Sequence, residues 1–440
     1  MNLKVDIEKI GHRGVGIGRS NGKVILVPLT APGDQVRVRI TASHRDYDEA
    51  EVISLINPSQ LRRDPPCPLF GQCGGCHLQH ISIRHQQALK EGVFRDLMTR
   101  KHTIPGEKIK SLLAAPREFE YRSRIEAHVL WEKNTAHLGF MARKTRRIVS
   151  VNKCLLALPP LQSLFNTVPS LLEEARAFEV TKVDMMCNEQ DDSSALTFWT
   201  NGRLSPALCD RLALLAPELS HLKGLYALPR GALSPIRLWE NDQCSSGIFY
   251  TIPSPATFGH IDLEAWPGVF RQVNPSVNRL LISTAIAWIN QNTPKRIADL
   301  YSGMGNFTIP ASFLAEEVVA VEDNPLAVEN AKANAFRHKC ENIRWITGSV
   351  KHGLKSLVMG GGSFDLAIMD PPRAGAKDSF KEILALGPKA LLYISCEPTT
   401  LARDIGFLQK NGPYEVVCTQ PLDMFPQTFH VESITLLERG

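Results

Sequence analysis

The stretch LLYISCEPT, residues 391–399, decides the fold class of this chain. Its apolar run predicts a buried strand that ends at Cys396, where Glu-Pro begins a loop. The same pattern occurs in FDLAIMDPPR, where Asp370 follows a buried strand, and in RIADLYSGMGNFT, where Gly303 and Gly305 follow one. In open α/β sheets, binding and catalytic residues lie at the carboxyl ends of such strands. We therefore expect three strands to bring a glycine turn, a carboxylate and a thiol to one edge of a sheet.

Residues 265–440 alternate strand-like and helix-like runs. This alternation predicts a doubly wound parallel sheet with an antiparallel tail, and so an α/β chain. Each local signal is weak alone, because a buried cysteine is more often a small core residue than a nucleophile. Together, and in this order, they resemble the RNA uracil-5-methyltransferase family, whose Ser-Cys-Asn-Pro nucleophile motif corresponds to Ser395, Cys396, Glu397 and Pro398. The resemblance reaches both chain ends and implies a Rossmann-like methyltransferase domain at 265–440.

Composition limits the class of protein. With 440 residues, 43% of them hydrophobic, the chain is long enough for about two to four domains with real cores. It has no run of about 18 apolar residues, and its start lacks the apolar core of a signal peptide, so we expect a soluble cytoplasmic protein without membrane segments. Ten cysteines in such a protein favour metal binding or catalysis over a disulfide framework.

The net charge of +5 hides an asymmetry. Residues 1–150 hold 25 Lys+Arg and 15 Asp+Glu, a net of +10, which leaves −5 for the remainder. An ordinary solvated surface can have charge distributed this unevenly, but a basic first third also favours binding to a polyanion such as RNA.

Residues 1–57 predict a small β-barrel, because short alternating runs are separated by turn signals at Asn21-Gly22 and Pro32-Gly33. Taken alone, this pattern assigns no ligand. It resembles a TRAM domain, an OB-like RNA-binding module. The candidates for phosphate contacts are Arg13, Arg19, Lys23, Arg37 and Arg39.

Three cysteines in CPLFGQCGGC, Cys67, Cys73 and Cys76, are close enough in sequence for one glycine-rich loop to wrap a metal centre. A fourth thiolate is needed, and Cys154 matches the distant cysteine of the family pattern. A four-cysteine zinc site suits the same ligands. The resemblance implies a [4Fe-4S] cluster.

Residues 58–264 form the predicted central domain. Helical periodicity over 81–110 predicts a helix that links the metal loop to the rest of this domain, and from 118 to 260 we expect short strands and turns. YRSRIEAHV and LGFMARKTRRIVSVNKC resemble the family's central domain, whose basic strands face RNA. The candidates there are Arg122, Arg124, Arg143, Lys144, Arg146 and Arg147.

Glu322 ends the strand after the glycine turn, where an acid binds ribose hydroxyls. NAD fits the same geometry, but the turn lacks a third glycine and Asp-Pro-Pro-Arg has no place in a dehydrogenase. The resemblance implies S-adenosylmethionine instead. By the same resemblance, the cofactor-binding positions are Gln272, Tyr301, Asn306, Glu322, Ser349 and Asp370.

The resemblance also implies a reaction. C5 of uracil becomes nucleophilic only after a thiolate adds at C6, and a base must later remove the C5 proton. Cys396 matches the nucleophile and Glu432 the base, with His430 on the same side of the segment. Asp370 is expected to hold the uracil edge, and Phe270 to stack on the flipped base.

Two departures from the family pattern stand near these residues: Glu397 replaces the usual Asn, and Tyr301-Ser302 replaces Phe-Cys. A carboxylate beside the nucleophile is expected to raise the pKa of the thiol. The expected substrate is 23S ribosomal RNA, with transfer RNA as the alternative, and we expect a monomer. Two other functions remain open: an RNA-binding chaperone without catalysis, and a methyltransferase that acts on an amino nitrogen.

Overall fold

A computed structural model describes residues 2–100, 103–241, 247–255 and 259–440. The chain begins with the predicted barrel, which is closed in the order β1-β2-β3-β5-β4. Asn21 and Gly22 both have positive φ, of 49° and 79°, as a two-residue hairpin turn requires. Alternating Val and Ile side chains fill the barrel. Its strands are β1 (Asn2–Ile10), β2 (Val15–Ser20), β3 (Lys23–Pro28), β4 (Gln35–Ser43) and β5 (Tyr47–Asn57).

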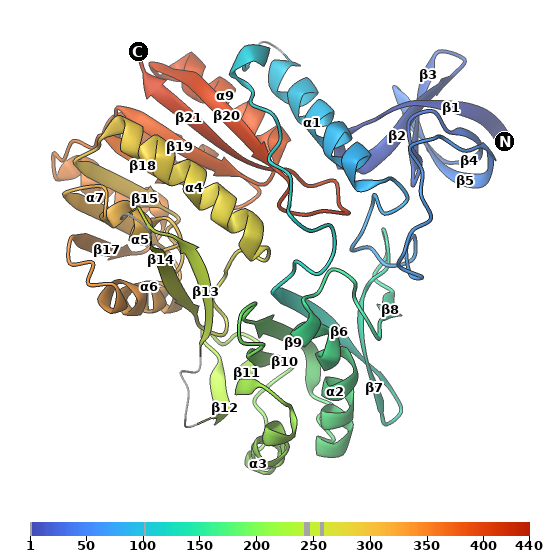
Figure 1. Cartoon of the computed structure of the whole chain (residues 1–440), viewed down its shortest axis with the longest axis horizontal. Helices are drawn as coiled ribbons and strands as arrows, with labels where there is room; N and C mark the ends of the chain where they lie inside the picture. The colour runs from blue at the N-terminus through green and yellow to red at the C-terminus, as the bar shows by residue number, and fades with distance from the viewer. Residues whose placement is uncertain (1, 101–102, 242–246, 256–258) are drawn as a thin grey trace.

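An irregular segment with the first three cysteines leads to α1 (Ile83–Thr99), the helix predicted within 81–110; residues 101–102 lie outside the described ranges. α1 lies between the barrel and the C-terminal sheet (Figure 1). Its buried residues Phe94 and Met98 join the core of that sheet. The helix therefore belongs spatially to the C-terminal half.

The central part is a seven-stranded sheet in the order β12-β11-β10-β9-β6-β7-β8, with two helices packed on it. The strands from 118 onward were predicted, but the helices were not. The strands are β6 (Arg124–Glu132), β7 (Thr135–Met141), β8 (Ile148–Ser150), β9 (Val180–Cys187), β10 (Ser194–Thr200), β11 (Leu222–Pro229) and β12 (Ile236–Glu240). The helices are α2 (Pro159–Ala175) and α3 (Pro206–Leu215).

A hairpin of β13 (Ile248–Pro253) and β14 (His260–Ala265) precedes the C-terminal sheet and shares its core. The division of the chain at 57 and 264 stays a prediction. The sheet has the order β17-β16-β15-β18-β19-β21-β20, in which β21 runs antiparallel to both neighbours, as the sequence predicts. Its strands are β15 (Arg296–Leu300), β16 (Glu317–Glu322), β17 (Ile343–Thr347), β18 (Leu366–Met369), β19 (Ala390–Ser395), β20 (Tyr414–Leu422) and β21 (Glu432–Arg439).

Helices cover both faces of this sheet, so the predicted doubly wound α/β architecture is confirmed. One face packs against α4 (Pro275–Asn292), α5 (Thr308–Ser312) and α6 (Pro325–Arg337). The other packs against α7 (Val350–Met359), α8 (Phe380–Leu386) and α9 (Pro398–Asn411), together with α1. In the described part of the chain, no helix combines the length and apolar character needed to cross a membrane.

Candidate active site and thiol-lined cavity

Sheet register brings the candidate nucleophile and base together. β19 and β21 are paired up to Ser395 and Ser433, and the Ser433 hydroxyl donates to the Ser395 carbonyl oxygen at 3.1 Å. The next residues outward on the two strands are Cys396 and Glu432. Facing positions of antiparallel strands have neighbouring side chains. The half-buried thiol therefore lies beside a carboxyl group that is only 3% exposed.

Asp370 reaches the same edge from β18, whose last residue, Met369, pairs with Tyr393 of β19. Burial raises the pKa of Asp370 to about 7. Burial also raises the pKa of Glu432 well above its usual value, and the charge of Asp370 raises it further. The edge thus holds two acids that retain protons more readily than exposed carboxyl groups do.

The Cys396 thiol is not activated by burial. Burial, followed by the charge of Glu432, raises its pKa to about 12, while Arg373 opposes this shift through its charge and a hydrogen bond. Arg373 is a functional candidate that the sequence patterns did not reveal, although it ends the quoted Asp-Pro-Pro-Arg motif. Its carbonyl oxygen accepts a hydrogen bond from the Thr400 hydroxyl at 3.1 Å, which ties the motif to α9.

Glu397 differs from its expected role. The carboxylates that raise the pKa of Cys396 are Glu432 and Asp370. Glu397 instead caps α9, because its Oε1 accepts hydrogen bonds from the Thr399 amide at 3.4 Å and hydroxyl at 2.7 Å. The same oxygen lies 3.3 Å from Nε2 of His12, in the barrel loop between β1 and β2. Glu397 therefore links the loop after Cys396 to the barrel.

The glycine turn after β15 has the left-handed backbone that glycine favours, with φ of 54° at Gly303 and 96° at Gly305. Glu322 faces this turn and accepts a hydrogen bond from the Gly303 amide at 2.9 Å. Burial raises the pKa of Glu322. Asn306 is held by hydrogen bonds with Asn278 at 2.9 and 3.1 Å. A half-buried acid beside a glycine turn can bind a ribose diol.

Ser349 lies two residues beyond β17, and the preceding Gly348 amide donates to the Glu322 carbonyl oxygen at 2.8 Å. Its hydroxyl accepts the His352 amide at 3.3 Å and caps α7, so Ser349 has a structural role besides its predicted one. Tyr301 has a φ of 66° at the glycine turn.

Phe270 and Gln272 flank the buried Arg271, whose guanidinium donates to carbonyl oxygens of Ser123 and Cys187 at 2.9 and 2.7 Å. This anchor leaves the Phe270 side chain 65% exposed, so its ring is accessible to a planar ligand.

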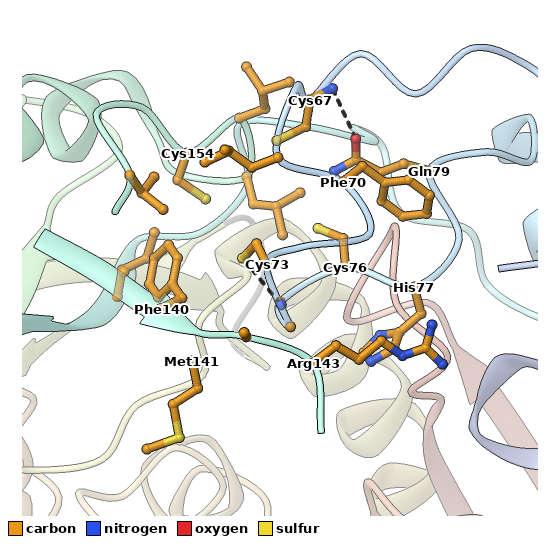
Figure 2. Close-up of a pocket in the computed structure, with 18 of the residues that line it drawn as sticks. Cys67, Phe70, Cys73, Cys76, His77, Gln79, Phe140, Met141, Arg143 and Cys154 are labelled. Atoms are coloured by element: carbon orange, nitrogen blue, oxygen red, sulfur yellow. Dashed lines mark hydrogen bonds between the residues drawn. The ribbon is translucent and has the colours of Figure 1, made fainter. Parts of the chain in front are cut away.

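The second site is a cavity of about 920 Å³ lined by Cys67, Cys73, Cys76 and Cys154. Figure 2 shows the four cysteines around one shared space. The Cys67 amide donates to Oε1 of Gln79 at 3.2 Å, which orders the loop. Burial and the charges of the other three thiols raise the pKa of Cys76 to about 12. Ionising Cys76 beside the other thiols would therefore require a compensating positive charge.

The cavity wall offers part of that charge. Arg122 lines the cavity, and its Nε has no hydrogen-bond partner within the described residues. No group of three or more His, Cys, Asp or Glu side chains in the described ranges has a spacing that could hold a metal ion. Arg122, whose side chain also hydrogen-bonds Tyr121, therefore places a positive charge beside the four thiols.

Five of the predicted RNA contacts line the same cavity: Arg13 of the barrel, Arg122, Arg143, Lys144 and Arg146. Arg124 instead forms a mostly buried ion pair with Asp184 at 2.7 Å, so the prediction that it contacts phosphate is wrong.

Two family models match this chain. The model described as tRNA (Uracil-5-)-methyltransferase matches residues 260–440, and the TRAM domain model matches residues 2–53. The first covers the C-terminal sheet with β14, and the second covers nearly all of the barrel.

Relatives match over the whole chain. A protein of Pseudomonas aeruginosa named 23S rRNA (uracil(1939)-C(5))-methyltransferase RlmD is 33% identical over 99% of this chain and 94% of its own length. Its namesake in Pseudomonas fluorescens is 31% identical over 99% and 91%. The crystal structure of Pyrococcus abyssi tRNA (uracil-54, C5)-methyltransferase in complex with S-adenosyl-L-homocysteine has a TM-score of 0.73, covers 99% of both chains and is 22% identical. At that identity, the likeness shows the fold.

Proposed function

Because the chain belongs to the RNA (uracil-5-)-methyltransferase family, we propose that it methylates C5 of a uridine in 23S ribosomal RNA with S-adenosylmethionine as the methyl donor. The rRNA target rests on relatives of 31–33% identity that are named for uracil 1939 and match 99% of this chain. The observation that carries the reaction is the juxtaposition of Cys396 and Glu432 at one sheet edge.

In the proposed reaction, the Cys396 thiolate adds to C6 of uracil, and the C5–C6 π electrons move toward O4. S-adenosylmethionine supplies an electrophilic methyl group, which C5 takes as the sulfonium–carbon bond breaks. Glu432 then removes the C5 proton, the C5–C6 double bond re-forms, and Cys396 leaves. The raised pKa of Glu432 suits this step, because it makes the ionised carboxylate a stronger base.

Other residues hold the reactants in this proposal. Arg373 stabilises the thiolate, Asp370 binds the uracil edge and Phe270 stacks on the flipped base. Burial lowers the pKa of His430 to about 3, so the ring is neutral, and it packs on Phe429 at 4.1 Å between ring centroids. The donor is bound by Gln272, Tyr301, Asn306, Glu322, Ser349 and Asp370.

We further propose that Cys67, Cys73, Cys76 and Cys154 hold a [4Fe-4S] cluster with a structural role, because methyl transfer from a sulfonium moves no net electrons. The shared cavity and the positive charge of Arg122 in its wall support a thiolate centre, and zinc is the alternative. Metal analysis of anaerobically purified protein decides between them. Iron with brown colour that Cys73→Ser removes supports the cluster, and zinc in wild type overturns it.

The RNA target is tested by mass mapping of ribosomal and transfer RNA from a strain that lacks the gene. Loss of one 5-methyluridine from 23S rRNA, restored by the wild-type gene, is the expected result. Loss from transfer RNA alone would assign the transfer RNA alternative, and no loss from either would favour an RNA-binding protein without catalysis.

A further inference from the structure

The segment 423–431, here called the connecting loop, joins β20 to β21 and leads directly to Glu432. It is buried at Asp423, Gln427 and Thr428, with exposures of 0%, 0% and 2%. Loops normally run over the surface, because buried backbone needs hydrogen-bond partners. Partners for this loop come from segments more than 300 residues away in the sequence.

Gln427 is the centre of this network. Its Oε1 accepts a hydrogen bond from Nε2 of Gln86 in α1 at 2.9 Å, and its amide donates to Oε1 of Gln86 at 3.1 Å. Its Nε2 donates to the carbonyl oxygen of Glu118 at 3.3 Å. Its φ of 69° is a backbone conformation that non-glycine residues rarely adopt. Only surrounding contacts of this kind hold a residue in such a conformation.

The backbone of Gln427 contacts residues 67–78, here called the cysteine loop, which carry Cys67, Cys73 and Cys76. Its carbonyl oxygen accepts hydrogen bonds from the amides of His77 at 2.8 Å and Leu78 at 3.0 Å, directly after Cys76. The Phe429 ring packs against His77 with 4.7 Å between centroids, and it also lines the cavity. The two loops therefore cannot shift independently.

The start of the connecting loop is anchored separately. Nζ of Lys90 in α1 lies 2.5 Å from Asp423 and donates to the Phe425 carbonyl oxygen at 2.9 Å, and both charged side chains are buried. Between Gln427 and Glu432, Thr428 accepts the His430 amide at 3.3 Å. Along the chain, Gln427 is thus the last residue before Glu432 that is hydrogen-bonded both to α1 and to the cysteine loop.

We propose that Gln427 is a positioning residue that sets the Glu432 carboxyl group against the C5 proton and makes this setting depend on the cysteine loop. The inference rests on the proposed function. It assigns the cysteine loop an influence on the elimination step, in addition to holding the N-terminal half together. Donor binding, at the glycine turn across the sheet edge, is expected to be independent of it.

The first test is Gln427→Leu, which removes the side-chain hydrogen bonds. Leu, like Gln, is a non-glycine residue, so the cost of the positive φ at this position stays the same. Gln420→Leu is the control, since Gln420 is also buried and hydrogen-bonded, in β20. A displaced base slows elimination after the thiol has added. We expect kcat to fall about 100-fold, with unchanged affinity for S-adenosylmethionine and a denaturation-resistant protein–RNA adduct that accumulates. Gln420→Leu should accumulate none.

Gln86→Leu removes the partner instead of Gln427 and should accumulate the same adduct to a smaller extent. Slow turnover without adduct, or a parallel loss of turnover, donor affinity and thermal stability in Gln427→Leu, would reduce Gln427 to a stability role and overturn the inference. If wild type itself neither methylates RNA nor forms an adduct with 5-fluorouridine RNA, the proposed function fails instead.

Dependence on the cysteine loop has its own test, which needs no turnover. Hydrogen–deuterium exchange is compared between wild type and Cys73→Ser, with Cys340→Ser as the control for a thiol outside the cavity. In Cys73→Ser we expect faster exchange of the amides of 424–431 and unchanged exchange of those of 301–306. In Cys340→Ser we expect exchange of both segments to match wild type. Unchanged exchange in 424–431 would show that the two loops are independent.

Discussion

The edge of the C-terminal sheet and the thiol-lined cavity both hold cysteines whose pKa burial raises to about 12, namely Cys396 and Cys76. Their neighbours differ. Cys396 lies among two carboxyl groups and Arg373, whereas Cys76 lies among three other thiols, with Arg122 in the wall. Burial alone therefore assigns no role to a thiol. A lone thiol needs to lose its proton only during a reaction, while four adjacent thiolates need a permanent positive charge.

The two regions also differ in what orders them. Cys396 follows a buried strand, so sheet register fixes its position. The cysteine loop has little regular structure and depends on partners elsewhere, including Gln79, Ala142 and Gln427. We expect substitutions in the first region to change chemistry and substitutions in the second to change stability and coupling.

The largest effect is expected for Cys396→Ala, which removes the nucleophile. Turnover should fall to background in a tritiated-methyl assay, while RNA binding by filter retention stays close to wild type, because the thiolate acts only in the chemical step. Cys418→Ala, a half-buried thiol in β20, is the control and should turn over normally. Methyl transfer by Cys396→Ala at the wild-type rate would remove the distinction between the two regions.

Glu432→Gln should allow addition and methyl transfer but block elimination, because nothing removes the C5 proton. The product is an adduct that survives denaturation and migrates slowly on a gel. Glu438→Gln changes an exposed carboxylate in the same strand and should form no stable adduct. Normal turnover by Glu432→Gln would place the base elsewhere on the sheet edge.

Arg373→Gln should slow adduct formation about tenfold at neutral pH, the effect of roughly one unit in the pKa of the thiol. Since the raised pKa lies above the working range, the thiolate fraction and the rate should both rise as pH increases from 7 to 9. The positive charge of Arg373 lowers that pKa, so the variant curve should lie at higher pH. The measurement is the rate of adduct formation with 5-fluorouridine RNA against pH. Arg344→Gln, an exposed arginine in β17, controls for lost charge, and coincident curves would exclude Arg373 from thiolate stabilisation.

Arg122→Gln is the matching change in the cavity. It should leave the rate of adduct formation nearly unchanged. If the cavity holds the proposed metal centre, the variant should also release metal to a chelator severalfold faster, because groups around a metal centre tune its affinity. Metal release followed by absorbance, beside the same adduct assay, separates the two regions. An equal effect on both readouts would show that the cavity charge reaches the sheet edge.

Glu397→Asn, which restores the usual residue of the family motif, should have the smallest effect. Asn caps helices as well as a carboxylate does, so α9 should keep its start. We expect the rate of adduct formation to change by less than about twofold, since other carboxylates raise the pKa of the thiol. A tenfold faster rate would instead support the expectation from sequence that Glu397 raises the pKa of the Cys396 thiol.

Local patterns predicted much of the fold. Alternating runs, the Asn21-Gly22 turn and the strand-end residues each carry a short-range signal. The barrel, the doubly wound sheet and the meeting of Cys396 and Asp370 at one sheet edge therefore followed from sequence. α2 and α3 did not, because Pro169 interrupts the helical pattern of α2 and α3 has only ten residues. Arg373 has no periodicity to mark it. The role of Gln427 depends on contacts with residues far away in the chain, which leave no local trace.

The Lys90–Asp423 pair joins residues 333 positions apart, and this separation has a consequence during synthesis. At ribosomal elongation rates, roughly half a minute passes between the appearance of the two residues. Until then, Phe94 and Met98 of α1 lack the sheet that buries them, so α1 exposes an apolar face on the nascent chain. A barrel that folds early is thus followed by a helix that must wait, and this interval is when a chaperone would be expected to bind.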